Sequence, residues 1–425
     1  MLKNKIKVAS LVCASLLAIT GCGGGKEAVN AEITVWCAAE EEAVLNDIVS
    51  AYNATQTEDT QKFNVKFVAV SEADAGTTVA KDPTAADAPA LFNFADDQLY
   101  TLQGKQILLE LKGDYKTRTI ANNSAVSVTG ASYNGKLYAF PYTSDNGYFL
   151  WYDADMLDDS KIGSLEDILS YCAANDKSIL MDVANGWYAN SFIMSPEACG
   201  TTSLFWKENA DGKAVYETTW DNEAGVKVSS YIASLLTPAF TDGNLIKGGN
   251  AEIVAGFKDK TLCAAISGTW MEKDLTMSGR NIKAAKLPSY HVDGKAYQMA
   301  TFTGSKLLGI NATKPVAEQK AAVALAELLC NKESQLKRFA VRKTLPCNNE
   351  AAADPAYTQN VSMGGKALVA QTSVAAAVQS LTAEGRYWDV GKAIGQAYLD
   401  GDLGGAADWA AFLKQQMDIL RSPGT

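Results

Sequence analysis

Short strand-like runs alternate with helical patterns along most of the chain, and this alternation constrains the fold more than any other feature. Residues 33–36 form a β-rich run, and residues 40–52 then place apolar side chains on one helical face. Further β-rich runs, each followed by a turn or a helical pattern, lie at residues 63–70, 91–94, 178–183 and 261–267. Repeated strand-to-helix units are typical of α/β proteins.

Length and charge narrow the class of protein. The chain has 425 residues, of which 47% are hydrophobic. This length exceeds what a single core usually organises, so we expect two lobes. The formal net charge is −10, and no Lys- or Arg-rich run occurs. Because phosphate contacts need clustered cations, a nucleic-acid partner is not expected.

The N-terminus carries a basic start followed by an apolar run from Val8 to Ile19. This run is too short for a membrane span, which needs about 20 residues, so residues 1–21 are predicted to be a secretory signal peptide. Cys22 directly follows Thr20-Gly21 in a stretch that resembles a bacterial lipobox. The resemblance implies that Cys22 is lipidated and that residues 22–30 anchor and tether an exported protein to the outer face of the cytoplasmic membrane.

Six further cysteines follow the lipobox. They are Cys37, Cys172, Cys199, Cys263, Cys330 and Cys347. Export makes disulfides possible, but a chain of this size does not need them, so both disulfides and buried free thiols are compatible with the sequence. No CxxC motif occurs, and a clustered zinc site is therefore not expected.

Signatures of catalysis are missing from the sequence. The only histidine, His291, lies before Val292-Asp293-Gly294 and is expected in an exposed polar turn, which disfavours a His-based catalytic centre. No GxSxG, Walker A or GxGxxG motif occurs. Asp96 and Asp97 are adjacent acids, but adjacency does not define the carboxyl separation of a glycosidase. We therefore expect a binding protein without cofactor or metal.

Several segments together resemble a known family. Residues 133–141 read YNGKLYAFP and residues 150–157 read LWYDADML, which is similar to the "YNGKLYAxP … YNxDLL" segment of maltose-binding-protein-like solute-binding proteins of carbohydrate ABC importers. Residues 264–270, AAISGTW, are similar to the family's "AMxIxGxW" strand. Residues 308–312 and 386–388 follow in the family's order, so the resemblance spans nearly the whole exported part of the chain.

The resemblance implies the type II periplasmic-binding-protein fold, with two Rossmann-like α/β lobes joined by hinge crossovers. Residues 31–143 and 306–355 would form lobe 1, and residues 147–303 and 360–425 would form lobe 2. The hinges would lie near Thr143–Asn146 and Thr303–Ser305. Since a bridge between lobes would obstruct closure, the resemblance favours a Cys330–Cys347 disulfide and leaves Cys37 as a buried thiol.

The family's binding residues are carried over by position. Sugar recognition needs flat apolar faces and planar polar groups that bond adjacent hydroxyls. The residues predicted in this way to contact the ligand are Glu40, Phe94, Asp97, Gln98, Asp145, Trp187, Tyr188, Trp270, Trp388 and Lys392. For the aromatic residues the alternative is core packing, and for the acids it is a solvated helix start.

Four positions depart from the maltose-binding pattern. Gln98 and Lys392 replace arginines, Phe94 replaces a tryptophan, and Glu40-Glu41 stands where an acidic-basic pair is expected. These departures argue against maltose itself as the ligand.

The resemblance implies a monomeric receptor that captures a sugar or an oligosaccharide by hinge closure and delivers it to the permease subunits of an ABC importer. Two alternatives stay open. A polyamine or another organic cation would suit the acids Glu40, Asp97 and Asp145, and a surface carbohydrate hydrolase is the alternative from a different class.

Overall fold

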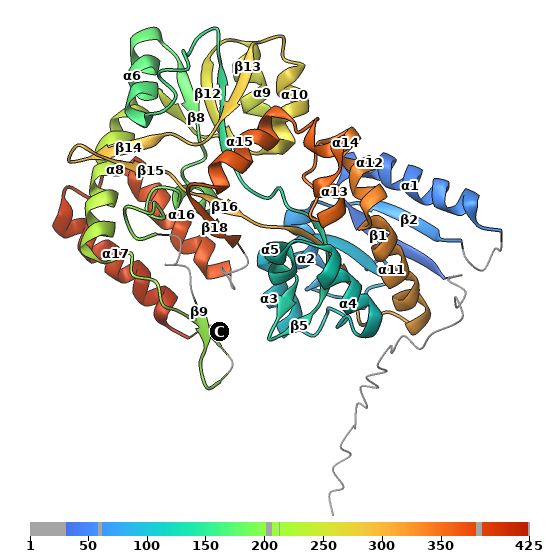
Figure 1. Ribbon diagram of the computed structural model, residues 1–425. Helices are drawn as coiled ribbons and strands as arrows, with labels where there is room; N and C mark the ends of the chain where they lie inside the picture. Colours follow the sequence, from blue (N-terminus) through green and yellow to red (C-terminus); the bar gives the residue numbers. More distant parts are fainter. Residues whose placement is uncertain (1–30, 58–61, 201–205, 212, 380–384, 424–425) are drawn as a thin grey trace, which may run out of the picture.

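The computed structural model describes residues 31–57, 62–200, 206–211, 213–379 and 385–423 (Figure 1). The predicted signal peptide, the predicted tether and Cys22 lie outside these residues. Within them the chain folds into two α/β units, each built around a five-stranded sheet. The expected α/β class is therefore confirmed.

The first sheet combines strands from two distant parts of the chain. In spatial order its strands are β2 (Asn64–Ala69), β1 (Glu32–Cys37), β3 (Leu91–Ala95), β17 (Lys306–Ile310) and β6 (Ala139–Thr143). β1 is parallel to β2 and β3, whereas β17 is antiparallel to both β3 and β6. The late strand β17 thus joins the early strands of this sheet.

Helices surround the first sheet, and several of them contribute buried apolar side chains to its core. They are α1 (Glu42–Thr55), α2 (Glu72–Val79), α3 (Leu99–Gly104), α4 (Gly113–Asn122), α5 (Ala125–Gly130), α11 (Val316–Leu329) and α12 (Lys332–Arg342). The face predicted for residues 40–52 is confirmed, because Val44, Leu45, Ile48 and Val49 of α1 are buried. Figure 1 shows α11 and α12, in orange, beside the blue strands β1 and β2.

The second sheet is buried on both faces. In spatial order its strands are β11 (Leu245–Ile246), β8 (Ser178–Leu180), β12 (Leu262–Ser267), β7 (Phe149–Asp153) and β13 (Ile282–Ala285). Every residue of β7 and β12 is buried, as expected of central strands with helices on both faces.

The surrounding helices of the second unit come mostly from the later half of the chain. They are α6 (Leu165–Asn175), α7 (Gly186–Ala189), α8 (Glu223–Thr241), α9 (Asn250–Lys258), α10 (Glu272–Thr276), α15 (Met363–Thr372), α16 (Gly385–Asp400) and α17 (Ala406–Arg421). Smaller elements are the helices α13 (Asn349–Ala353) and α14 (Pro355–Thr358) and the strand pairs β4 (Ser132–Tyr133) with β5 (Lys136–Leu137), β9 (Trp206–Glu208) with β10 (Ala214–Tyr216), β14 (Ser289–Val292) with β15 (Lys295–Gln298), and β16 (Thr301–Thr303) with β18 (Ala376–Val378).

Two segments of extended chain connect the sheets. One runs from Thr143, which ends β6, to Phe149, which begins β7, and the other runs from Thr303 to Lys306. The second is braced by the buried Asp96, whose Oδ2 accepts a hydrogen bond from the Ser305 N–H at 3.0 Å. These segments include the residues predicted as hinges, and their role in lobe movement stays a prediction.

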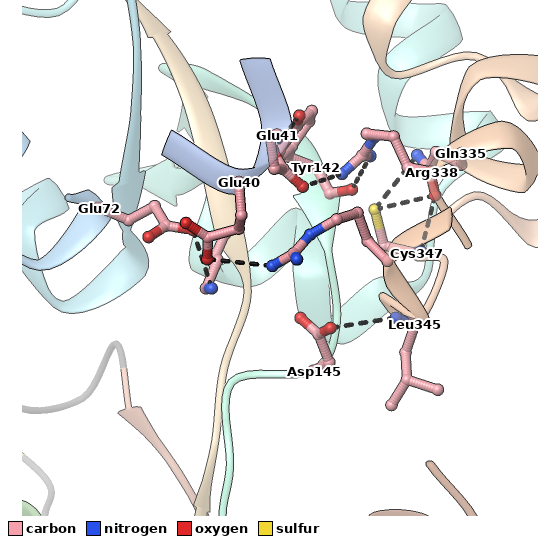
Figure 2. Close-up of polar contacts among 11 residues, drawn as sticks. Glu40, Glu41, Glu72, Tyr142, Asp145, Gln335, Arg338, Leu345 and Cys347 are labelled. Atoms are coloured by element: carbon pink, nitrogen blue, oxygen red, sulfur yellow. Dashed lines mark hydrogen bonds and ion pairs between the residues drawn. The ribbon is translucent and has the colours of Figure 1, made fainter. Parts of the chain in front are cut away.

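The cysteines differ from one expectation. All six described cysteines are free, so the predicted Cys330–Cys347 disulfide is wrong for this structure. The Cys347 thiol instead lies against the Gln335 side chain, whose Oε1 accepts a hydrogen bond from the Cys347 N–H at 2.9 Å (Figure 2). Cys37 is buried and free, as expected.

His291 also differs slightly from its predicted place. It is exposed, but it lies in strand β14, which leads into the turn, and not in the turn itself. Its Nδ1 is 3.3 Å from Glu166 Oε2.

Candidate ligand-binding site

Charged residues gather at one edge of the first sheet. Glu40 follows β1, Glu72 follows β2, Asp97 follows β3 and Asp145 follows β6. The carboxyl ends of these co-directional strands meet at the same edge, where ligands commonly bind in α/β sheets. Because β17 runs in the opposite direction, its first residue, Lys306, lies at that edge as well.

Two of these carboxylates are paired with cations from distant parts of the chain. Arg342 Nη2 on α12 is 3.0 Å from Glu40 Oε1, and Lys306 Nζ is 2.9 Å from Glu72 Oε1. Burial lowers the pKa of Lys306, but the charges of Glu72 and Asp145 outweigh burial and raise it overall. The site therefore contains acid–base pairs whose basic members the sequence reasoning missed.

A buried cluster supports the segment that carries Glu40 (Figure 2). The Tyr142 hydroxyl donates a hydrogen bond to Glu41 Oε2 at 2.5 Å, and Arg338 Nη1 lies 3.6 Å from Glu41 Oε1. The Arg338 guanidinium also stands 3.4 Å from the centroid of the Tyr142 ring. These contacts join β6, α12 and the turn after β1 beneath Glu40.

One carboxylate oxygen of Asp145 accepts a hydrogen bond from the backbone, and the other oxygen accepts none from the described residues. Its Oδ2 accepts a hydrogen bond from the Leu345 N–H at 3.1 Å (Figure 2). Its buried Oδ1 has no hydrogen-bond partner among the residues that the structure describes. Asp145 can therefore accept a further hydrogen bond at the connection between the two sheets.

Asp97 links the first unit to the aromatic residues of the second. Burial raises the pKa of Asp97 to about 6, while hydrogen bonds from the Gln379 and Trp388 side chains oppose this shift. Gln379 Oε1 in turn accepts hydrogen bonds from Asn146 Nδ2 at 2.9 Å and from Trp187 Nε1 at 3.0 Å. Gln379, which the sequence reasoning missed, thus joins a connecting segment to both units.

Two predicted site residues have structural roles. Phe94 is fully buried in the core of the first unit, with its ring centroid 5.4 Å from that of Phe92, so the prediction that it stacks on a ligand is wrong. The Gln98 Nε2 group donates hydrogen bonds to the Glu72 and Ala73 carbonyls, at 2.9 and 3.2 Å. The Gln98 amide therefore fixes the start of α2, and its role as a ligand contact stays a prediction.

The four predicted aromatic residues of the second unit are all half-buried and lie on neighbouring elements. Trp187 and Tyr188 belong to α7, Trp270 to the 3-10 turn η5 (Thr269–Met271), and Trp388 to α16. The Trp187 ring centroid is 5.0 Å from that of Tyr188 and 5.9 Å from that of Trp270. The aromatic surface predicted from separate segments is therefore assembled in space.

Local sequence features set the positions of these rings. The Asn185 side chain caps α7 by accepting a hydrogen bond from the Trp187 N–H at 3.0 Å. A Cβ on Gly186 would lie 2.4 Å from the Trp388 carbonyl oxygen, so glycine allows α7 to pack against α16. Lys392 is exposed one turn beyond Trp388 on α16.

A small cavity of about 240 Å³ lies beside the aromatic surface. It is lined by Leu180, Asp182, Asn185, Tyr188, Gly248, Gly249, Asn250, Ile253 and Ile266. These residues lie at or beyond the carboxyl ends of β8, β11 and β12. Their position after a strand is the only feature of the sequence that could have identified them. Asn250 Oδ1 also accepts a hydrogen bond from Trp270 Nε1 at 3.3 Å, so the cavity and the aromatic surface are continuous.

The model of the bacterial extracellular solute-binding protein family matches residues 47–365. This chain belongs to that family. Its structure is similar to one solved with acarbose, with a TM-score of 0.76 at 26% identity, covering 92% of this chain and 99% of that chain. No match was found among curated proteins.

Other members of similar fold are more distant in sequence. The ligand-free maltodextrin-binding protein MalE1 from L. casei BL23 has a TM-score of 0.75 at 20% identity, covering 92% of this chain and 99% of that chain. The maltose-maltodextrin-binding protein of Alicyclobacillus acidocaldarius has a TM-score of 0.72 at 15% identity, covering 91% and 100%. The expected type II periplasmic-binding fold of this solute-binding protein is thereby confirmed.

Membership in the family also places the protein outside the cytoplasm, as an exported solute-binding protein. Across the described part of the chain, no helix is both long and apolar enough to span a membrane. In the same residues, no group of three or more His, Cys, Asp or Glu side chains is arranged to hold a metal ion.

Proposed function

We propose that this solute-binding protein captures a carbohydrate, of oligosaccharide size, between its two lobes and presents it to the permease of an ABC importer. The half-buried aromatic surface of Trp187, Tyr188, Trp270 and Trp388 carries this proposal. Such rings match the C–H faces of sugars, and the acids and amides around them suit adjacent hydroxyls. Similar structures were solved with acarbose and with maltotetraose.

Capture works by closure around the ligand. In the proposed division, residues 31–143 and 306–355 form lobe 1, and residues 147–303 and 360–425 form lobe 2. A sugar that touches Asp97 and Asp145 on one side and Trp270 on the other binds the closed arrangement better than the open one. That difference in affinity shifts the population towards the closed arrangement.

The charge pairs favour a hydroxyl-rich ligand over an organic cation. Arg342 and Lys306 neutralise the carboxylates of Glu40 and Glu72, so the edge of the first sheet is less anionic than the acids alone suggest. A hydrolase gains no support from the adjacent acids, since Asp96 is buried and bonded to the Ser305 backbone.

A thermal-shift screen of the purified protein against mono- and oligosaccharides tests this proposal. A ligand that binds only the native state raises its stability by RT ln(1 + [L]/Kd). We expect oligosaccharides to raise the unfolding midpoint, and putrescine and spermidine to leave it unchanged. A shift with the polyamines and none with any sugar would favour the cation-binding alternative.

We further propose that Cys22 is lipidated after removal of residues 1–21, so that a monomeric receptor is tethered at the outer face of the cytoplasmic membrane. The lipobox-like sequence supports this. The Cys22→Ala variant should move from the membrane fraction to the soluble or medium fraction. Retention of the variant in the membrane fraction would contradict the lipid anchor.

A further inference from the structure

Two buried cysteines of the second lobe lie in contact with each other. Cys172 on α6 and Cys263 on β12 are 91 residues apart in sequence, yet their Sγ atoms are 3.4 Å apart. Both side chains are fully buried. The pair is therefore brought together by the packing of α6 on the second sheet.

The other described cysteines have different surroundings. The Cys199 thiol donates a hydrogen bond to Asn222 Oδ1 at 3.6 Å, and the Cys347 thiol lies against Gln335. Cys263 is distinguished further by its backbone, because the pairing of β12 with β8 shifts register between Leu262 and Ala264. Cys263 thus sits at a local irregularity of a central strand and next to a second thiol.

We propose that Cys172 and Cys263 are a redox site that is oxidised to a disulfide in the exported protein. An Sγ–Sγ separation of about 2.05 Å is needed, so the sulfur atoms must approach by little more than 1 Å from their present 3.4 Å. Extracellular compartments permit such bonds, and family membership places the protein there. The proposal rests on export and not on the identity of the ligand.

The oxidation proceeds by thiol–disulfide exchange with a small-molecule or protein disulfide. The thiolate of one cysteine attacks the oxidant and releases one thiol, and the second cysteine then attacks the mixed disulfide and releases the other thiol. Two protein thiols are oxidised, one oxidant disulfide is reduced to two thiols, and the protons pass to the released thiolates. Both thiols are fully buried in the folded protein, out of reach of an oxidant, so we expect the exchange to take place during folding, before the core closes. The thiol contact with Cys172 and burial also raise the pKa of Cys263 in the folded protein.

The bond would stabilise the part of lobe 2 that carries the ligand site. β12 leads directly to Gly268, whose carbonyl accepts a hydrogen bond from Trp151 Nε1 at 3.1 Å, and then to Trp270. Joining α6 to β12 closes a long loop and reduces the conformational freedom of the unfolded chain. Reduction should therefore lower the midpoint of thermal unfolding by about 5 °C or more.

Peptide mapping of the exported protein tests the proposal directly. The protein is denatured with iodoacetamide, with and without prior reduction, and digested for mass spectrometry. We expect Cys172 and Cys263 to be alkylated only after reduction and to appear otherwise as one cross-linked peptide pair. Alkylation of both residues without reductant would overturn the proposal.

A second measurement uses matched variants. The midpoint of thermal unfolding is compared with and without reductant for the wild type, for Cys172→Ala and Cys263→Ala, and for the control Cys330→Ala. Reductant should lower the unfolding midpoint of the wild type and of the control. It should leave the midpoints of Cys172→Ala and Cys263→Ala unchanged. A reductant effect that persists in Cys263→Ala, or that is absent from the wild type, would contradict the disulfide.

Discussion

Trp270 shows how a single residue can join the features of the site. Its ring lies near Trp187, and its Nε1 donates a hydrogen bond to Asn250, which lines the neighbouring cavity. A Cβ on the preceding Gly268 would lie 2.0 Å from the Trp270 ring, so glycine lets this ring fold back over the end of β12. The indole is therefore positioned by local sequence and is half-buried.

Replacing Trp270 with alanine should weaken carbohydrate binding by about 1 to 3 kcal/mol, because a half-buried aromatic contact would be lost. The ligand-free fold should survive the change. Isothermal titration calorimetry measures the affinity, and urea unfolding measures the stability. Met277→Ala is the matched control, since Met277 is exposed just beyond the adjacent helix α10. Unchanged affinity with lower stability would assign Trp270 to the core.

The raised pKa of Asp97 leads us to expect that the free energy of unfolding depends on pH. Burial raises its pKa to about 6, above the ordinary value of 3.8, so the folded protein holds this proton more tightly than the unfolded chain. The stability contributed by the protonated form is complete below about pH 4 and is lost as pH rises through about 6.

The wild type should therefore gain about 1 kcal/mol in free energy of unfolding between pH 7 and pH 5, relative to Asp97→Asn. The asparagine side chain has no charge to lose in this range. Urea unfolding of both proteins at the two pH values measures the difference. An identical pH dependence in the two proteins would show that the pKa of Asp97 is not raised in solution.

At this scale the sequence predicted acids and aromatic residues better than their partners. Trp270 and Asp97 could be predicted because each follows a strand at a position where the family resemblance places a ligand contact. Arg342 and Lys306 could not, since their pairing depends on how α12 and β17 pack against the first sheet. Phe94 was misassigned because the sequence does not show whether an aromatic residue near the end of a strand faces the core or a ligand.

Helix α12 determines much of the arrangement at the scale of elements. Arg338 and Arg342, one turn apart on this helix, reach two adjacent glutamates in the turn after β1. Arg338 is buried with Glu41, whereas Glu40 beside Arg342 is about half exposed. One helix thus provides a buried and a partly exposed ion pair for comparison.

Arg338→Ala should destabilise the protein by about 3 to 5 kcal/mol, because it leaves the Glu41 carboxylate buried without its cation. Arg342→Ala, the matched control, should cost less than about 1 kcal/mol, because its partner is solvated. Urea unfolding of both variants measures these costs. Equal and small effects would show that the Arg338 cluster does not hold α12 to the sheet.

Local periodicity predicted several elements well. The strand expected at residues 33–36 is β1, and the strand expected at 261–267 is β12. The insertion of β17 between β3 and β6 was not predictable from periodicity, because it is a long-range pairing. The order of strands therefore had to come from the structure, and it is this order that brings Lys306 into the site.

At the scale of the whole molecule, two extended segments join two sheets, and the groups proposed to bind the ligand lie on both sides of these segments. Gln379 contacts Asn146 in one segment and Trp187 in the second unit, and it also bonds to Asp97 of the first unit. In the proposed function, a ligand that enters here replaces contacts between the lobes with contacts to itself. We therefore expect binding and the relative position of the lobes to be coupled.

Small-angle X-ray scattering tests this coupling most directly. The radius of gyration is measured for the ligand-free protein and for the protein saturated with the oligosaccharide that gives the largest thermal shift. We predict a smaller radius of gyration in the saturated protein, because contacts on both lobes favour the closed arrangement. Equal dimensions in the two states, with saturation verified by calorimetry on the same sample, would contradict capture by closure of the lobes.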